Sequence, residues 1–502
     1  MLKTLKLENF KCFGRPATIP LAPITLIYGP NSGGKSSLIQ SLVLMQQTLA
    51  RGHGTTALVP RGELVDLGSF TSMVHRHNLE NQLKISVTAQ PFGRTPNEPA
   101  FSFRSLEDHE IGMQLTFGAA KSPDSAKRDS SQLMSVEYSI QEPSPPTPTE
   151  ESTNPQDRSR SIRLTLEPSA RQPSSFRHQD NTIAWELTPQ SQGSAAEWIL
   201  DTPSRSTSDP ATVQRWLEST VVAPDGLLPA FLVPTATQRE ASSALDLQHL
   251  THIRRALPLD GIAGSLQRAL LRLSYLGPLR IHPERYYSLS NASVDTVGKT
   301  GENAPQVIFQ RGKEVTDQIN RWFEAFEVPY ELQAKKLGDE VTGHILAITL
   351  VDQRTGVVVG PSDVGFGIGQ LLPIIVEGVV SEGKTICVEQ PEIHLHPRLQ
   401  AHVADLLIET ANLSEDASSS TPCGMQWIVE THSESLVLRL QRRIREGTLR
   451  AKDVSVLYVE PTANGSLVHE LRLQADGEFL DEWPDGFFEE SFNELFSSEW
   501  DD

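Results

Sequence analysis

Eight residues near the N-terminus constrain the fold more than any other part of the sequence. The pattern G-x-x-x-x-G-K-[ST] is matched in full by Gly29-Pro30-Asn31-Ser32-Gly33-Gly34-Lys35-Ser36. The apolar run 24–28 before it is typical of a buried strand, and apolar residues at helical spacing follow it as far as Leu49. The sequence therefore predicts a strand, a glycine-rich loop and a helix, an arrangement that binds phosphates. The alternative is a plain glycine-rich turn between a strand and a helix.

The chemistry of such a loop follows from its backbone. Glycines let the chain wrap around phosphates with its amide hydrogens pointing inward, and the start of the helix adds a partial positive charge. Lys35 is expected to reach the β- and γ-phosphates of ATP, and the Ser36 hydroxyl is expected to bind Mg²⁺. The residues predicted to contact the nucleotide here are Gly29, Pro30, Asn31, Ser32, Gly33, Gly34, Lys35, Ser36 and Ser37.

Two later apolar runs each end in a glutamate. The first, 385–389, ends in Glu389, which is predicted to hold the hydration shell of Mg²⁺ together with Ser36. The second, 426–430, is followed by Thr431-His432-Ser433, where His432 is placed to touch a γ-phosphate. Glu392, His394 and His396 alone would suggest a metal site, but no third distant ligand cluster accompanies them.

These segments, in this order, resemble the RecF/SMC-like branch of ABC ATPases, which includes the ATPase heads of the overcoming-lysogenization-defect (OLD) nucleases. The resemblance rests on residues 5–13, the phosphate loop, residues 389–397 and residues 430–433. It implies an α/β fold, namely an ABC-type P-loop NTPase head with a mixed sheet and flanking helices. It also implies that ATP and Mg²⁺ bind between two heads, so that the protein forms a homodimer or a higher homo-oligomer through its ATP sites.

In that branch a signature loop of one head caps the ATP of the other. The candidate is residues 362–370, whose sequence departs from the common L-S-G-G-Q, and a plain loop before a helix is the alternative. A glycine-rich helix start would donate backbone amides to a phosphate. The residues predicted to make this contact are Ser362, Gly367, Gly369 and Gln370.

A second departure concerns the chemistry of hydrolysis. ABC heads normally follow the strand acid with a glutamate that activates water, whereas this chain has Gln390. Glutamine orients a water but cannot accept its proton, and general-base help is worth roughly 10²–10⁴-fold. Either Glu392 takes that role, or hydrolysis is slow and the ATP-bound dimer lives long. Gln390, Glu392 and His432 are therefore the predicted catalytic residues.

The predicted organisation is a head split by a large α+β insertion. Residues 1–87 form the N-terminal lobe, 88–275 the insertion, 276–475 the C-terminal lobe and 476–502 an acidic aromatic tail. The Pro-rich run 141–150 inside the insertion predicts a disordered or extended loop, with strands near 161–166 and 182–187. Helical spacing returns at 238–255 and 263–275.

Charge and cysteine content bear on the partners. A formal charge of −19 argues against coating nucleic acid by bulk attraction, although arginines gather at 254–285 and 439–450 and would contact DNA phosphates locally. Packing against the protein's own carboxylates is the alternative. Three cysteines without a C-x-x-C pair favour the cytoplasm, and no stretch predicts a membrane span. The tail carries eleven acids and an aromatic stripe, which either docks on a partner or packs on its own domain.

The sequence thus predicts an ATP-binding and ATP-hydrolysing head whose nucleotide-dependent dimerisation controls DNA or an effector. Relatives in this branch act in DNA repair or anti-phage defence, often beside a separate nuclease, as in the PARIS system. The alternative is a slow or non-hydrolysing ATP-binding scaffold that regulates a nuclease or toxin. A self-contained nuclease is disfavoured because few residues follow Leu473, and a transporter subunit because a large insertion interrupts the head.

Overall fold

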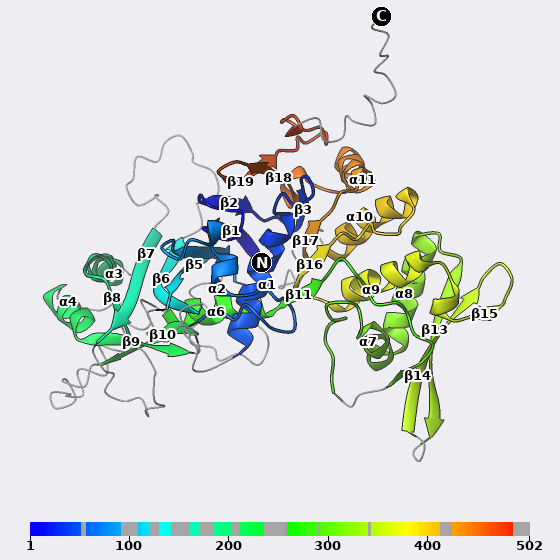
Figure 1. Ribbon diagram of the computed structural model, residues 1–502, viewed down its shortest axis with the longest axis horizontal. Coiled ribbons are helices and arrows are strands. Elements are labelled where there is room, and N and C mark those ends of the chain that lie inside the picture. Colours follow the sequence, from blue (N-terminus) through cyan, green and yellow to red (C-terminus); the bar gives the residue numbers. More distant parts are fainter. Residues whose placement is uncertain are drawn as a thin grey trace, which may run out of the picture. The chain divides into compact units, whose positions relative to one another are not determined.

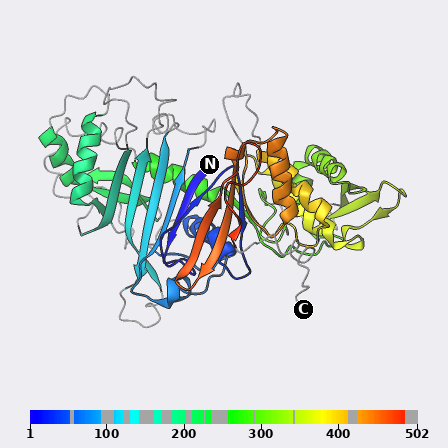
Figure 2. The same ribbon diagram turned by 90° about the horizontal axis from the view of Figure 1, so that it is seen from above.

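The chain divides into two compact units, and one boundary between them falls inside a helix. Unit 1 comprises Met1–Ile19 and Gln40–Leu271, and unit 2 comprises Pro20–Ile39 and Arg272–Asp502, so helix α1 (Lys35–Ala50) contributes to both. Figures 1 and 2 show the computed structural model. The structure describes residues 1–51, 57–91, 109–120, 130–141, 161–170, 184–201, 210–225, 227–234, 257, 259–288, 292–339, 343–411 and 424–484.

Some sequence predictions fall outside these ranges. They are the helix expected at 238–255, all but the first residue of the Pro-rich run and the tail beyond residue 484.

Unit 1 is built on a nine-stranded sheet of order β10-β9-β8-β7-β6-β5-β4-β1-β2. In β4 the residues alternate between buried and half-buried, as expected for a sheet with one covered face. The strands are β1 (Leu2–Glu8), β2 (Ala17–Pro20), β4 (Leu83–Ala89), β5 (Glu110–Ala119), β6 (Ser131–Gln141), β7 (Ser161–Ser169), β8 (Ala184–Leu187), β9 (Thr220–Asp225) and β10 (Leu228–Pro234). The helices are α2 (Phe70–Met73), α3 (Pro189–Asp201), α4 (Pro210–Glu218) and α6 (Leu259–Leu271).

The units divide the chain differently from the predicted lobes and insertion. Strand β1 pairs with β4, and β4 pairs with β5, with Ile85 opposite Leu115. One backbone ladder therefore runs from the N-terminal strand into the stretch predicted as an insertion. The Pro- and Ser-rich composition after residue 88 marks connections between strands of one sheet, because composition reports loops and not hydrogen-bonded pairing.

Unit 2 contains the phosphate loop and a six-stranded sheet of order β11-β16-β17-β3-β18-β19. Its first five strands are parallel, and β19 pairs antiparallel with β18 at the edge. All residues of β3, β16 and β17 are buried, as in parallel sheets covered on both faces. The strands are β3 (Ile24–Tyr28), β11 (Leu273–Leu276), β16 (Thr385–Glu389), β17 (Gln426–Glu430), β18 (Val454–Thr462) and β19 (Gly465–Leu471).

A smaller sheet and five helices complete unit 2. Strands β13 (Tyr330–Asp339) and β14 (Gly343–Asp352) form a long hairpin, visible in Figure 1, which β12 (Tyr287–Ser288) and β15 (Val358–Val359) extend. The helices are α7 (Ala304–Arg311), α8 (Lys313–Ala325), α9 (Phe366–Val380), α10 (Pro397–Ala411) and α11 (Glu434–Arg445). Strand β3 leads through the glycine-rich loop into α1, so the predicted ABC-type P-loop α/β fold is confirmed.

Candidate nucleotide site

The phosphate loop is shaped by close contact with β18. A Cβ atom on Gly29, whose φ is +140°, would overlap the backbone oxygen of Val459, and one on Gly33 would lie 3.2 Å from the same oxygen. The Ser466 hydroxyl of β19 donates to the Gly33 oxygen at 2.7 Å. Only glycine fits at Gly29, and a side chain at Gly33 would be tightly packed, so the edge strands hold the loop in its curved form.

Lys35 lies inside this curve. Its Nζ donates to the backbone oxygens of Gly29 and Pro30, each at 2.9 Å, and the residue is only 4% exposed. Burial lowers the pKa of Lys35, while the charges of Glu430 and Glu392 act in the opposite direction. The ammonium group is therefore held by carbonyls of the loop that would surround bound phosphates.

Two glutamates lie next to each other at the carboxyl ends of neighbouring strands. Glu389 of β16 and Glu430 of β17 are register partners. The Tyr275 hydroxyl donates to Glu389 Oε1 at 2.9 Å. Burial first, and the charge of Glu430 second, raise the pKa of Glu389 to about 7, while Tyr275 and Arg280 lower it. Buried carboxylates this close are costly without a cation, so the pair suits a metal ion.

Glu430 was not among the site residues predicted from the sequence. In the structure the Ser36 hydroxyl hydrogen-bonds its carboxylate. Burial raises the pKa of Glu430, and the bond from Ser36 and the charge of Lys35 oppose that shift. The signal that would have found it is an acid closing a second buried strand, since parallel strands end at one edge of the sheet.

The turn after β16 is fixed from two sides. Gln390 has a φ of 47°, which is uncommon for a residue with a side chain. Its backbone N–H donates to the backbone oxygen of Glu430 at 2.7 Å. The buried Arg280 side chain donates to the backbone oxygen of Gln390 at 2.9 Å and to the backbone oxygen of Glu389 at 2.7 Å. Arg280 therefore sets the direction in which Gln390 leaves the strand, a role that sequence reasoning did not assign.

Glu392 connects this turn to the segment after β17. Its two carboxylate oxygens accept from the Thr431 hydroxyl and from the His432 N–H, each at 2.7 Å. Burial lowers the pKa of His432, and the positive charge of Lys35 lowers it further. Glu392 thus holds the His432 backbone close to the phosphate loop, and its role as an acid that activates water stays a prediction.

The predicted signature loop packs against the same turn. A Cβ on Gly367 would lie 3.0 Å from the His394 oxygen, and one on Gly369 would lie 2.8 Å from Pro283. Gln370 is 1% exposed, and its side-chain amide donates to the Arg280 oxygen at 3.4 Å.

These contacts within the chain explain why the loop has glycines at 367 and 369 and a buried glutamine at 370. Ser362 precedes α9 in the short helical turn 361–363. Among the described residues, no hydrogen bond joins residues 362–370 to residues 29–36.

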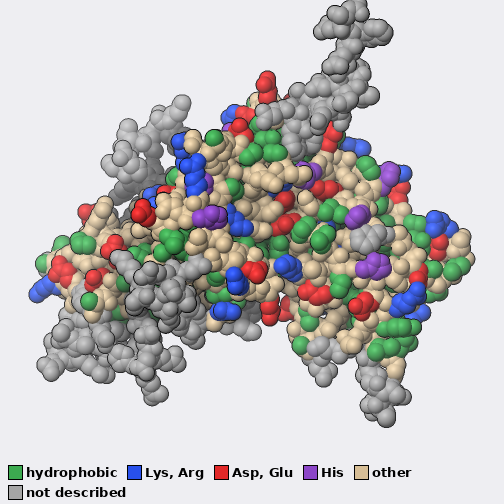
Figure 3. Space-filling model, viewed as in Figure 1, with side chains coloured by type: hydrophobic (Ala, Val, Ile, Leu, Met, Phe, Trp, Pro, Cys, Tyr) green, Lys and Arg blue, Asp and Glu red, His purple; other side chains and the backbone are tan. Residues whose placement is uncertain are grey.

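The structure also bears on the metal site suggested by Glu392, His394 and His396 and on the arginine clusters. In the described ranges no group of three His, Cys, Asp or Glu residues is arranged to hold a metal ion. Arg439 and Arg443 pair with Asp405, and Arg442 pairs with Glu446, as the alternative to DNA binding predicted. Figure 3 shows acidic and basic side chains interspersed over the visible face. Residues 254 and 255 lie outside the described part of the chain.

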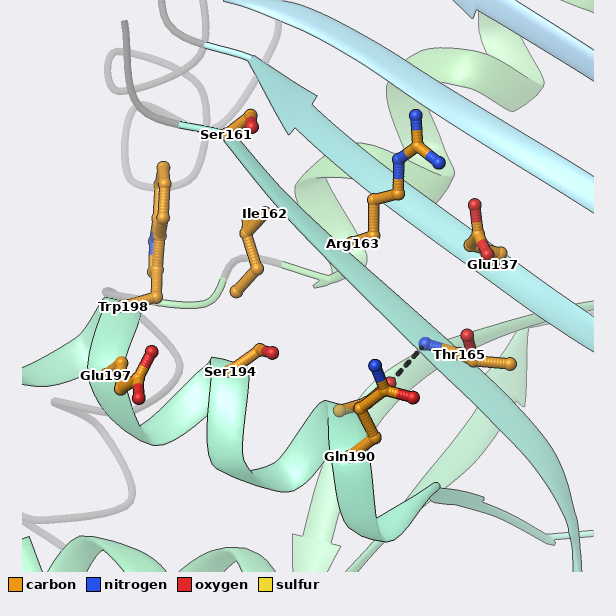
Figure 4. A pocket seen from close by; sticks show the side chains of 10 residues that line it. Glu137, Ser161, Ile162, Arg163, Thr165, Gln190, Ser194, Glu197 and Trp198 are labelled. Carbon is orange, nitrogen blue, oxygen red and sulfur yellow. Dashed lines mark hydrogen bonds between the residues drawn. The ribbon is translucent and has the colours of Figure 1, made fainter. Parts of the chain in front are cut away.

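A separate cavity lies in unit 1. Its volume is about 460 Å³, and it is lined by residues of β6, β7 and α3, where Trp198 stands beside Ile162 (Figure 4). The Thr165 N–H donates to the Ser191 hydroxyl at its base, at 2.8 Å. No residue of the predicted nucleotide site lines this cavity.

Three sequence families match parts of the chain. A family described as AAA domain matches residues 4–48, which contain the phosphate loop. A family described as AAA ATPase domain matches residues 288–437, which contain Glu389, Glu430 and His432. A family described as protein of unknown function (DUF3696) matches residues 449–497. The two AAA matches cover the phosphate loop, Glu389, Glu430 and His432, and they support an ATPase of the ABC type.

The solved structures that match include heads of SMC proteins. An Smc head bound to the C-winged helix domain of ScpA has a TM-score of 0.41 at 10% identity, covering 94% of this chain and 98% of that one. The SMC head domain from Thermotoga maritima has a TM-score of 0.33 at 11% identity, with 94% and 99% covered. The Pyrococcus furiosus Smc head bound to the C-terminal domain of ScpA scores 0.35 at 13% identity, with 94% and 96% covered. No curated protein matches.

No helix among the described residues is both long and apolar enough to cross a bilayer.

Proposed function

We propose that unit 2 binds ATP with Mg²⁺ and hydrolyses it. The observation that carries the proposal is the convergence of Lys35, Ser36 and two buried carboxylates at the carboxyl edge of the parallel sheet. These residues fit ATP with Mg²⁺. Gly29 leaves room where a Cβ would collide with the Val459 oxygen, and the carboxylates supply the hard oxygens that Mg²⁺ prefers.

Each residue of the site has a distinct task in this proposal. Mg²⁺, when bound, draws charge from the phosphates and so makes the terminal group easier to attack. Lys35 exchanges the two loop carbonyls for phosphate oxygens, and Ser36 and Glu389 hold the metal and its waters. His432, kept neutral by burial and by Lys35, donates a hydrogen bond to the terminal phosphate.

Slow hydrolysis follows from the residue after Glu389. Gln390 orients a water without accepting its proton, and Glu392 already accepts two hydrogen bonds from the neighbouring segment. The chain therefore spends most of its time with ATP bound, which suits a switch better than a fast motor. Because of Gln390, an ATP-binding scaffold that does not hydrolyse is the second candidate.

Control of DNA or of an effector protein through an ATP-bound homodimer is the wider proposal. It rests on the resemblance to the RecF/SMC-like branch, and so do the suggested roles in DNA repair or anti-phage defence. The proposed cytoplasmic location rests on the three cysteines without a C-x-x-C pair. The signature loop offers a direct test because a Cβ on Gly365 would meet no atom within 4 Å inside the chain. Gly365→Ala should leave the monomer stable but weaken ATP-dependent dimerisation, measured by native mass spectrometry.

The hydrolysis proposal is tested by nucleotide binding and single-turnover rates. The wild type should bind ATP, and Gln390→Glu should hydrolyse it faster by a factor of roughly 10² or more. Binding without any hydrolysis in either protein would favour the scaffold. Failure of the wild type to bind ATP, with or without Mg²⁺, would contradict both candidates.

A further inference from the structure

Resting on the proposed function, a further inference concerns Glu430. We infer that Glu430 binds Mg²⁺ together with Ser36, so that the metal site has two acidic groups, Glu430 and Glu389. Sequence comparison with ABC heads points only to the acid at the end of the 385–389 strand. The hydrogen bond from Ser36 to Glu430 adds the acid of the neighbouring strand.

The order of the strands places Glu430 next to the phosphate loop. Strand β17 lies between β16 and β3 in the sheet. Neighbouring strands lie about 4.8 Å apart, so β16 is roughly two such spacings from β3 and β17 is one. The register pairs Glu430 with Ile27 of β3, two residues before Gly29. A carboxylate at this position lies close enough to the Ser36 hydroxyl to accept a hydrogen bond from it.

One oxygen of Glu430 lacks a hydrogen-bond donor. The residue is 4% exposed, and its Oε2 has no hydrogen-bond partner among the described residues. Lys35, whose charge acts on Glu430, donates its Nζ hydrogens to the backbone oxygens of Gly29 and Pro30. Leaving a buried carboxylate oxygen without a donor destabilises the folded protein. A cation that binds this oxygen would offset the cost.

The neighbouring carboxylate strengthens the inference. Glu389 and Glu430 are register partners, and like charges at this separation repel each other unless a cation lies between them. Tyr275 donates to Glu389, and Ser36 to Glu430, so each acid keeps acceptor capacity for a further partner. Mg²⁺ binds hard oxygens of this kind and retains several waters, which the second carboxylate would accept as hydrogen bonds.

A purely structural role for Glu430 makes a different prediction. In that case its carboxylate only restrains Ser36 and Lys35, and its loss weakens ATP binding equally with and without the metal. In the metal-binding role, its loss removes only the part of the affinity that Mg²⁺ contributes. Without metal, affinity stays level or improves, because a negative charge near the phosphates has gone.

The experiment compares Glu430→Gln with Glu434→Gln, which removes the same charge from an exposed position four residues later. ATP affinity is measured in Mg²⁺ and in EDTA, and Mn²⁺ affinity of the ATP complex is measured by electron paramagnetic resonance. Glu430→Gln should bind Mn²⁺ roughly 10- to 100-fold more weakly and lose the Mg²⁺-dependent gain in ATP affinity. Glu434→Gln should behave as the wild type.

Wild-type Mn²⁺ affinity in Glu430→Gln, or equal losses in Mg²⁺ and EDTA, would overturn the inference. Circular dichroism checks that the variant folds, and Glu430→Asp, which keeps the charge on a shorter side chain, replaces it if it does not. Glu430→Asp should weaken Mn²⁺ binding as well, and unchanged binding would again contradict the metal role. If the wild type binds no ATP in either buffer, the proposed function fails instead, so the two failures are distinguishable.

Discussion

The two units differ in what they bury. In the described residues of unit 1 the buried polar side chains are uncharged, for example Thr116, Ser131 and Ser265. In the part of unit 2 that the structure describes, seven charged side chains are buried, and four of them lie at the candidate site or hold its backbone. The seven are Lys35, Arg280, Asp352, Glu377, Glu389, Glu430 and Asp453.

This difference separates a scaffold from a site. Burying a charge costs several kcal/mol unless it is paired, and an ordinary core avoids that cost by using apolar residues. Unit 1 follows this rule with an alternating antiparallel sheet. In unit 2 the cost is concentrated at the ends of β16 and β17, where Glu430 Oε2 has no partner among the described residues. The buried Glu430 carboxylate therefore indicates where a ligand binds.

Removal of a buried cation should give the largest loss of stability. Arg280→Ala leaves the backbone oxygens of Glu389 and Gln390 without their donor. We therefore expect the free energy of unfolding to fall by about 3 kcal/mol. Arg285 forms an exposed ion pair with Asp363, so Arg285→Ala should cost less than about 1 kcal/mol. Denaturant unfolding measures both. Equal losses would contradict the distinction between buried and exposed charge.

Removal of Lys35 tests the other buried cation. Lys35→Ala should weaken ATP binding about 100-fold, since charge-assisted hydrogen bonds contribute up to about 3 kcal/mol. Lys313, exposed at the start of α8, provides a matched control, and Lys313→Ala should bind ATP as the wild type does. Calorimetric titration measures both affinities. Unchanged affinity in Lys35→Ala would show that the phosphates bind elsewhere.

The raised pKa of Glu389 predicts a pH dependence for the nucleotide-free protein. Its pKa is about 7 in the folded chain against an ordinary 4.5, so the folded state holds the proton more tightly than the unfolded state. Stability should therefore fall as pH rises from about 4.5 to 7, by on the order of 2 kcal/mol. Glu389→Gln should flatten this slope in EDTA. A slope that survives the substitution would assign it to other groups.

Glycine substitutions give the smallest effects and opposite signs in the two units. Gly369→Ala places a Cβ 2.8 Å from Pro283, and we expect a loss of about 1–2 kcal/mol in unit 2. Gly193→Ala in α3 of unit 1 meets nothing within 4 Å and should stabilise by about 0.5–1 kcal/mol. Melting temperatures measure both. If Gly369→Ala were as stable as the wild type, packing against Pro283 would not explain this glycine, and contact with the nucleotide of a partner head would explain it instead.

Local pattern was sufficient to predict the loop, strands and helix that carry the candidate site residues. The loop 29–36, the buried strands 385–389 and 426–430 and the helix after the loop follow from glycine spacing and apolar runs, because these features depend on neighbours in sequence. The structure contains the loop, both strands and the helix after the loop, as the sequence predicted. The predicted catalytic roles of Gln390, Glu392 and His432 stay predictions.

Only the tertiary structure decided which distant groups meet. Arg280, more than a hundred residues before Gln390 in sequence, holds its carbonyl, and Glu430 receives the Ser36 hydroxyl because β17 lies between β16 and β3. The same holds for the unit boundary, since β1 joins β4 through backbone pairing that leaves no mark on composition. Strand order is set by long-range packing, and a single sequence specifies it only through the whole fold.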